Sequence, residues 1–315
     1  MEPILYIVVP CYNEEEVLAE TTKRLTAKLN AMIKGNVVSS ESRIMYVNDG
    51  SKDRTWEIIN DFYKSNEFVT GVNLSRNRGH QNALLAGLMT AKEYADIVIS
   101  MDADLQDDIE VLDKFVEEYK NGSEIVYGVR SSRKKDTFFK KHTALAFYKI
   151  MEKMGVEIVY NHADYRLMSK RAIEELAGYK EVNLFLRGII PMIGFKTSTV
   201  EYERDKRFAG ESKYPLKKMI AFAIDGITSC SIKPIRLITT FGFLIFLISM
   251  LLLIYVVIGY FLGNTVAGWP TLMVLMCFFG GFQIMSIGVV GEYVGKIYME
   301  TKERPRFIIA DKIVK

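Results

Sequence analysis

Two aspartates separated by one residue directly follow a short apolar run. Residues 97–101 have the pattern of a buried strand, and Asp102, Asp104 and Gln106 come next at every second position. Because side chains of an extended chain alternate between two faces, this spacing can bring all three to one side. Oxygen ligands at the carboxyl end of an α/β strand suit a divalent cation that holds a diphosphate. Taken alone, an Asp-x-Asp pair is more often a solvated turn.

Strand and helix patterns alternate through the first 130 residues. The periodicity predicts strands at 4–9, 43–47, 69–74, 97–101 and 124–129, and helices at 14–33, 55–64, 81–94 and 109–121. Strict alternation predicts an α/β fold whose mostly parallel sheet carries helices on both faces. The functional edge of such a sheet lies at the carboxyl ends of its strands. Residues 143–205 mix both patterns and give no order of elements.

Other polar clusters fall at the same expected edge, at 11–14, 48–51, 75–77 and 128–130. Tyr12 could stack on a base, and Asp49 could accept hydrogen bonds from the N–H groups of that base. Each has an alternative. Tyr12 could simply pack at a strand end, and Asp49 could form a helix N-cap or an Asx-turn before Gly50. The convergence on one edge favours a binding site.

Glycine-rich phosphate loops are missing from the sequence, which has neither G-x-x-x-x-G-K-S/T nor G-x-G-x-x-G. Kinases, ATPases and dehydrogenases are therefore disfavoured. A metal and basic side chains would have to hold the phosphates instead, and the candidates are Arg130, Arg207 and Lys213. Alternatively, these three residues are positive charges beside a membrane. Asp164 could orient an acceptor or act as a base, or could serve only in structural hydrogen bonds.

Composition excludes several classes of protein. A formal net charge of +3 over 315 residues does not indicate nucleic-acid binding. The three cysteines are too far apart for a disulfide framework or a zinc site, which favours reduced thiols facing the cytosol. The three histidines have no metal-ligand spacing, so no role is assigned to them. Charged residues make up 25% of the chain, yet residues 237–291 contain none.

That uncharged stretch predicts a two-helix transmembrane hairpin, at about 238–262 and 271–291, since roughly 20 apolar residues span a bilayer. Residues 213–236 are predicted to form an amphipathic helix in the membrane interface. Basic residues flank both sides of the hairpin, so the positive-inside rule places both ends in the cytosol. The expected organisation is a cytosolic domain over 1–212, the interfacial helix, the hairpin over 237–291, and a cytosolic tail over 292–315. This organisation predicts a multi-pass protein of the inner (cytoplasmic) membrane.

The chain resembles the polyprenyl-phosphate glycosyltransferases of glycosyltransferase family 2, which include dolichol-phosphate mannose synthases and bactoprenol glucosyltransferases. The resemblance rests on residues 9–15, 102–107 and 207–213 and runs over nearly the whole chain. It implies a GT-A fold and Mg²⁺ or Mn²⁺ as cofactor. It also implies that the nucleotide-sugar contacts Pro10, Tyr12, Glu14, Asp49, Asp102 and Ala103. The metal would contact Asp102, Asp104 and Gln106, and Asp104 would be catalytic. Phosphate groups would contact Arg130, Arg207 and Lys213. The sequence departs from the family pattern at Asn48 and Asp108.

The activity implied by the resemblance is an inverting transfer of one sugar from a UDP-sugar to undecaprenyl phosphate. Glucose is the first choice of sugar and N-acetylglucosamine the second. Such an acceptor needs little deprotonation, since a phosphomonoester has a second pKa near ~6. Alternatives are a GDP-mannose donor, or a non-catalytic membrane scaffold that partners a flippase or a second transferase. We also expect a homo-oligomer, because Gly280, Gly281, Gly288 and Gly291 permit close helix contact.

Overall fold

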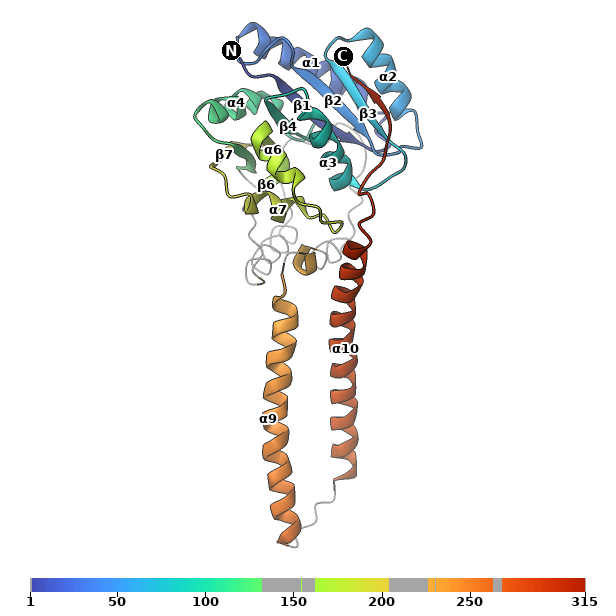
Figure 1. The fold of residues 1–315 in the computed structure, drawn as a ribbon, viewed down its shortest axis with the longest axis vertical. Coiled ribbons are helices and arrows are strands. Elements are labelled where there is room, and N and C mark those ends of the chain that lie inside the picture. Colours follow the sequence, from blue (N-terminus) through green and yellow to red (C-terminus); the bar gives the residue numbers. More distant parts are fainter. Residues whose placement is uncertain are drawn as a thin grey trace.

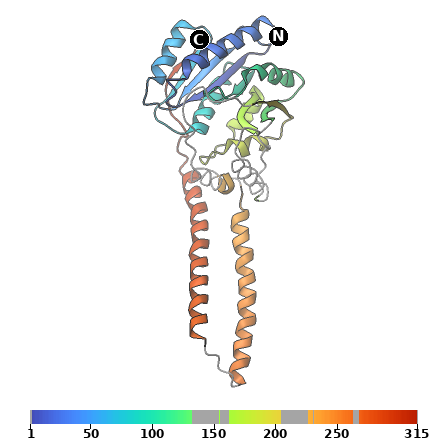
Figure 2. The same cartoon turned by 180° about the vertical axis from the view of Figure 1, so that it is seen from behind.

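The computed structural model describes residues 2–131, 154, 162–203, 226–229, 231–262 and 268–314. An α/β unit lies at one end of the molecule, and two long helices extend from it side by side (Figures 1 and 2). Both chain ends lie at the α/β unit, so the chain leaves this unit through one long helix and returns through the other.

One mixed sheet forms the centre of the α/β unit, with the strand order β7-β5-β6-β4-β1-β2-β3-β8. The strands are β1 (Leu5–Cys11), β2 (Arg43–Asn48), β3 (Val69–Leu74), β4 (Ile97–Ser100), β5 (Ile125–Arg130), β6 (His162–Ser169), β7 (Thr197–Tyr202) and β8 (Ile309–Ile313). The pairs β1–β2, β1–β4, β2–β3 and β5–β7 are parallel. Strands β6 and β8 run antiparallel to their neighbours. The predicted α/β fold with a mostly parallel sheet is confirmed.

Helices cover both faces of this sheet. They are α1 (Leu18–Lys34), α2 (Thr55–Ser65), α3 (His80–Ala91), the 3-10 turn η1 (Ile109–Val111), α4 (Leu112–Lys120), α6 (Lys170–Ala177) and α7 (Leu186–Met192), followed by the long helices α9 (Lys233–Phe261) and α10 (Trp269–Thr301). Side chains of α1 and α4 pack in one core, and side chains of α3, α6 and α7 pack in the other. Strand β1 serves both cores, since Ile7 faces the first and Val8 the second.

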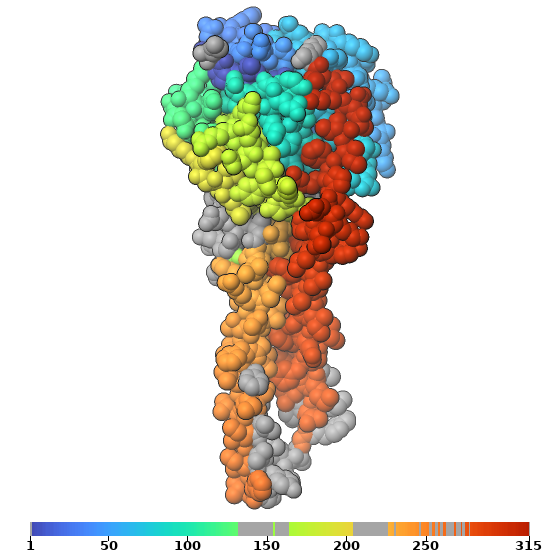
Figure 3. Space-filling model, in the orientation of Figure 1, coloured from blue at the N-terminus to red at the C-terminus, as the bar shows by residue number. Residues whose placement is uncertain are grey.

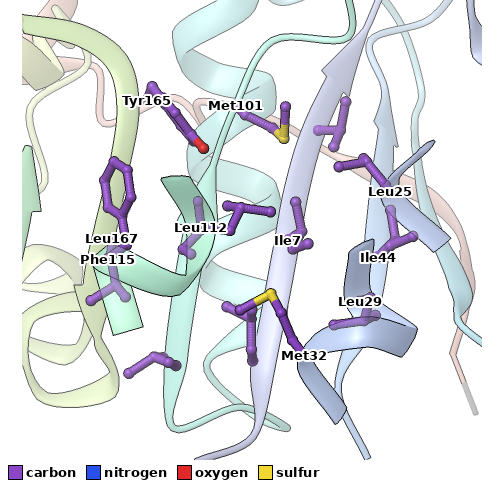
Figure 4. Close-up of a cluster of buried hydrophobic side chains, with 14 of the residues drawn as sticks. Ile7, Leu25, Leu29, Met32, Ile44, Met101, Leu112, Phe115, Tyr165 and Leu167 are labelled. Atoms are coloured by element: carbon purple, nitrogen blue, oxygen red, sulfur yellow. The ribbon is translucent and has the colours of Figure 1, made fainter. Parts of the chain in front are cut away.

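The core under α1 and α4 shows why the central strands read as continuous apolar runs. Leu25, Leu29 and Met32 of α1 pack onto Ile7 and Ile44 of the sheet (Figure 4). All five side chains are at most 1% exposed. A strand that is buried on both faces favours near-continuous apolar runs, such as residues 5–9 in β1, 44–47 in β2 and 97–99 in β4.

The second long helix continues well beyond the predicted span. Residues 292–315 were expected to form a tail, but α10 runs on to Thr301 and β8 follows it. Strand β8 joins the free edge of β3, where Val72 pairs with Lys312. Figure 3 shows this C-terminal segment in red, lying against the surface of the α/β unit. The edge of the sheet is thereby covered by the segment that follows α10.

Large apolar side chains cover the outside of the two long helices. Leu251 and Ile258 on α9 and Ile284 and Ile287 on α10 are each more than half exposed. The helices touch through Phe241 and Phe282, whose ring centroids are 5.0 Å apart. In the described part of the chain, one segment, Lys233–Leu251, is long and apolar enough to cross a bilayer. The two-span hairpin stays a prediction, and residues 213–225 of the expected interfacial helix lie outside the described residues.

Candidate functional site

The carboxyl ends of β1, β2, β3, β4 and β5 meet at one edge of the sheet, as parallel pairing requires. Strand β6 runs the opposite way, so it brings its beginning to the same edge. Ser100 at the end of β4 pairs with Arg166, and its hydroxyl donates to the carbonyl of Asp164 at 2.7 Å. Asp164 therefore joins the residues that follow β4.

The loops after β1 and β2 are tied to each other by hydrogen bonds. Asn13 has a positive φ of 55°, its N–H donates to Ser51 Oγ at 3.0 Å, and its Oδ1 accepts from the N–H of Lys52 at 2.9 Å. The N–H of Glu14 donates to Thr55 Oγ1 at 2.9 Å. This network lies on either side of the strand end that carries Tyr12, a residue that is 41% exposed. Pro10 is buried within β1.

Asp49 anchors the loop that follows β3. Its Oδ1 accepts from the N–H of Arg78 at 2.6 Å, and its Oδ2 accepts from the N–H of Gly79 at 2.9 Å. Burial raises the pKa of Asp49, and the two N–H donors partly oppose this rise. A carboxylate has about four acceptor positions, so a contact with a base would use the capacity that remains.

Residues 101–107 realise the alternation expected from the sequence. Met101, Ala103 and Leu105 are buried, whereas Asp102, Asp104 and Gln106 are partly exposed. Leu105 has a positive φ of 55°, and Asp104 Oδ1 accepts from the N–H of Gln106 at 3.2 Å. This local turn presents the three polar side chains at the surface of the edge. Ala103 contributes its carbonyl, which accepts from Thr21 Oγ1 at 2.9 Å.

The donor set of this loop fits a cation that shares its coordination with a ligand. Within the described residues, no group of three or more His, Cys, Asp or Glu side chains is arranged to hold a metal ion. Asp102 lies near His80, while Asp104 turns back onto its own loop. Mg²⁺ is commonly held by one or two carboxylates, with water and substrate phosphates as its other ligands. Asp102, Asp104 and Gln106 offer such a partial set.

A buried polar cluster supports the same loop from beneath. Asp107 is 5% exposed, and its Oδ1 accepts from Tyr202 Oη at 2.6 Å. Burial and the neighbouring charge of Asp102 raise the pKa of Asp107 to about 6, and the charge of Arg130 opposes that rise. The positive charge of Arg130 thus acts on the carboxylate of Asp107. The other predicted phosphate ligands, Arg207 and Lys213, lie outside the described residues.

Asp164 is held between two arginines. Arg187 on α7 places Nη2 at 2.8 Å from Oδ2 and Nε at 3.3 Å from Oδ1, and the buried Arg166 pairs with Oδ1. Burial alone would raise the pKa of Asp164, but the charges of Arg187 and Arg166 outweigh it and hold this pKa well below its usual range. A carboxylate in this state is a poor base, so the structure favours an orienting role for Asp164 over a basic one.

His80 and Arg187 lie beside the predicted site residues, and the sequence had not singled them out. His80 begins α3, and its Nε2 lies 3.6 Å from Asp102 Oδ1 and 3.9 Å from Asp164 Oδ2. It therefore stands between the two acidic groups of the edge. The signal available in the sequence was its place six residues after the predicted strand end at 74 and directly before the predicted helix at 81–94. Arg187 gave no signal, because its helix fell in the stretch without a readable order.

Comparisons with known proteins place this geometry in a family. The model for glycosyl transferase family 2 matches residues 6–177. The chain is 54% identical over 308 residues to the uncharacterized glycosyltransferase YkoT of Bacillus subtilis, covering 98% of this chain and 91% of the relative. It is 40% identical over 308 residues to the bactoprenol glucosyl transferase of Shigella phage SfX, covering 97% and 98%. Among solved structures, S. aureus TarS with UDP-GlcNAc matches with a TM-score of 0.47 at 15% identity, covering 72% and 66%.

Proposed function

The chain belongs to glycosyl transferase family 2 and is a glycosyltransferase, and we propose that it transfers one glucose residue from UDP-glucose to undecaprenyl phosphate. The similarity to a protein named bactoprenol glucosyl transferase carries this proposal, because it extends over 97% of this chain and 98% of the relative. It therefore includes the long helices as well as the α/β unit. Glucose is the sugar that the name of this relative indicates.

The donor would occupy the carboxyl edge of the sheet. We assign the nucleoside to Pro10, Tyr12, Glu14, Asp49 and Ala103, and the diphosphate to the surface of residues 102–106. Asp102, Asp104 and Gln106 would hold Mg²⁺ or Mn²⁺ there. When bound, the cation would neutralise the diphosphate and stabilise the charge that develops on the leaving group. The positive side chains at the edge would align the remaining phosphate oxygens.

The acceptor phosphate would act as the nucleophile. Its oxygen attacks the anomeric carbon of glucose, the bond between that carbon and the donor phosphate breaks, and UDP leaves with the electron pair. Attack opposite the leaving group inverts the anomeric centre. The phosphate is largely dianionic at neutral pH, since its second pKa is near ~6, so no strong base is required. This agrees with an Asp164 that is committed to Arg187 and Arg166.

The arginine side chains beside Asp164 also favour an anionic acceptor. Two guanidinium groups, Arg166 and Arg187, share one carboxylate, Asp164. These three side chains sum to one formal positive charge, and the carboxylates of Asp102 and Asp104 lie elsewhere on the same edge. Arg187 is 28% exposed on its side chain and can reach a ligand, whereas Arg166 is 1% exposed. We assign the acceptor phosphate to the side of the site formed by Arg187, with Arg130, Arg207 and Lys213 as further phosphate contacts.

The long helices would keep the enzyme at its lipid substrate. Exposed apolar side chains on α9 and α10 suit a bilayer, and the segment Lys233–Leu251 has the length to cross one. We propose a two-helix membrane anchor, with the α/β unit and both chain ends in the cytosol. We further propose that the protein forms a homo-oligomer in the bilayer. A flippase would accept its lipid-linked product.

A donor panel tests the choice of sugar. Full-length protein in detergent would be incubated with undecaprenyl phosphate, Mg²⁺ and labelled UDP-glucose, UDP-N-acetylglucosamine or GDP-mannose. We expect lipid-extractable label from UDP-glucose at a rate well above the other two. If only GDP-mannose gave label, GDP-mannose and not UDP-glucose would be the donor. If no donor gave a lipid-linked product, the non-catalytic scaffold would become the better account.

A further inference from the structure

The last turn of α10 contacts the catalytic unit through one carboxylate. Glu300 Oε2 accepts from the N–H of Val182 at 2.8 Å, and its Oε1 accepts from the N–H of Asn183 at 2.8 Å. The side-chain amide of Asn183 donates to the same Oε1 at 2.6 Å. Three donors on two consecutive residues thus converge on one ionised group. Hydrogen bonds to an ionised acceptor are stronger than neutral ones, so this contact holds the segment firmly.

The segment held by Glu300 leads directly into the site. Leu186, three residues after Asn183, begins α7, and its N–H donates to Gln81 Oε1 on α3 at 2.8 Å. The next residue is Arg187, which forms the two-point contact with Asp164. The start of α7 is therefore held from two sides, by α3 and by α10.

We propose that Glu300 is a positioning residue for the transfer reaction, which acts by holding segment 182–186 so that Arg187 meets Asp164 in a fixed geometry. This inference rests on the proposed function and adds a link from α10 to the site. Since α10 is one of the two helices assigned to the membrane, its position relative to the α/β unit sets the place of Arg187. The catalytic edge is in this way aligned with the helix that fixes the enzyme at its lipid acceptor.

Other contacts keep α10 docked when Glu300 is changed. Arg306 Nη1 donates to the carbonyl of Tyr179 at 2.7 Å, and Lys296 Nζ donates to Ser229 Oγ at 3.0 Å. Strand β8 pairs with β3 over several residues. Asn183 Nδ2 also donates to the carbonyl of Lys296 at 3.4 Å, so loss of the Glu300 carboxylate would loosen segment 182–183 without detaching the helix. Its effect should appear in catalysis before it appears in folding.

The test uses steady-state kinetics of the full-length protein with UDP-glucose and undecaprenyl phosphate. We expect Glu300→Ala to lower kcat about tenfold while the KM for UDP-glucose stays within about twofold, since the donor contacts other residues. Glu300→Gln retains one acceptor oxygen and should recover part of kcat. The exposed neighbour Glu303 provides the matched control, and Glu303→Gln should behave as wild type.

A double-mutant cycle with Arg187→Ala examines the route of the effect. If Glu300 acts through Arg187, adding Glu300→Ala to Arg187→Ala should cost less than twofold more. A full additional tenfold loss would contradict the proposal, and so would a Glu300→Ala enzyme with wild-type kcat. If Glu300→Ala failed to fold, the same cycle with Glu300→Gln would decide. Wild-type protein without transfer activity would instead overturn the proposed function itself.

Discussion

Arg187 on α7 forms a bidentate contact with Asp164 on β6, with Nη2 2.8 Å from Oδ2 and Nε 3.3 Å from Oδ1. This contact joins a helix and a strand across 23 residues of sequence, and it fixes the ionised state of the carboxylate. Asp164 therefore serves as a charged support for arginine side chains. Transfer to a phosphate acceptor needs alignment and charge stabilisation, and it needs no strong base.

Replacing Asp164 by Asn should destabilise the fold and reduce transfer. The change leaves the charges of Arg166 and Arg187 together without their carboxylate, and breaking a buried ion pair costs about 3–5 kcal/mol. Thermal unfolding of the wild type and of Asp164→Asn at neutral pH measures this difference. Variants with equal midpoints would show that the ion pairs contribute nothing to stability.

The same pair of proteins gives a pH dependence with a defined sign. Because the pKa of Asp164 is held well below its usual range, its contribution to stability is fully present above the unfolded-state pKa, about 3.9. It is lost as the pH falls through the lower folded-state pKa. The stability gap between wild type and Asp164→Asn should thus persist from about pH 8 to pH 5 and shrink only below about pH 4. A gap that closed near neutral pH would contradict the role of these ion pairs.

Asp104→Ala should abolish transfer while leaving the protein folded. The side chain is partly exposed, and Oδ1 accepts from the N–H of Gln106 within the same loop, so we expect the variant to stay folded. Loss of a metal and diphosphate ligand should lower kcat by about a hundredfold or more. Asp108→Asn on the same loop is the control, since the amide can still cap the turn that begins at Ile109. Near-normal turnover of Asp104→Ala would show that the acidic run is only a turn.

Tyr12→Ala should weaken donor binding more than Tyr12→Phe. Tyr12 is 41% exposed at the edge, and stacking of a base on an aromatic ring contributes about 1–3 kcal/mol. The KM for UDP-glucose is therefore expected to rise roughly tenfold in Tyr12→Ala and to change little in Tyr12→Phe. An unchanged KM in both variants would remove Tyr12 from the donor site.

Two glycines allow a matched test of the loop after β3. Both Gly50 and Gly79 have a positive φ, 61° and 85°, so alanine is strained at either position. A Cβ on Gly50 would lie 2.5 Å from the backbone of Arg76 and Asn77, whereas a Cβ on Gly79 would meet nothing within 4 Å. Gly50→Ala should therefore lower the unfolding midpoint clearly more than Gly79→Ala. Equal midpoints would mean that the loop moves freely away from Gly50.

The central strands were readable from sequence because they are buried on both faces. Strand β3 was predicted at 69–74 and is found at Val69–Leu74, and the other four predicted strands are displaced by only one or two residues at their ends. The alternation that followed β4 was also readable, since buried and partly exposed residues take turns from Met101 to Asp107. Local periodicity determines both features.

The elements that were missed depend on distant contacts. Strand β8 is largely exposed and shows no alternation of burial, so only its pairing with β3 defines it. Strand β6 brings Asp164 to the edge because it runs antiparallel to β4, a direction that no local pattern encodes. The positions of His80, Arg187 and Glu300 follow from how α3, α7 and α10 dock, and these contacts cannot be derived from one sequence segment.

Formation of a lipid-linked glucose is the decisive measurement for the proposed activity. Purified full-length protein would receive labelled UDP-glucose and Mg²⁺ with undecaprenyl phosphate, or with undecaprenol that lacks the phosphate, and Asp104→Ala would be assayed beside it. We expect label in the organic phase, as an inverted glucosyl phosphate linkage, only with wild-type protein and the phosphorylated lipid. Equal labelling of undecaprenol, or no labelling of undecaprenyl phosphate by wild-type protein, would contradict transfer to a lipid phosphate.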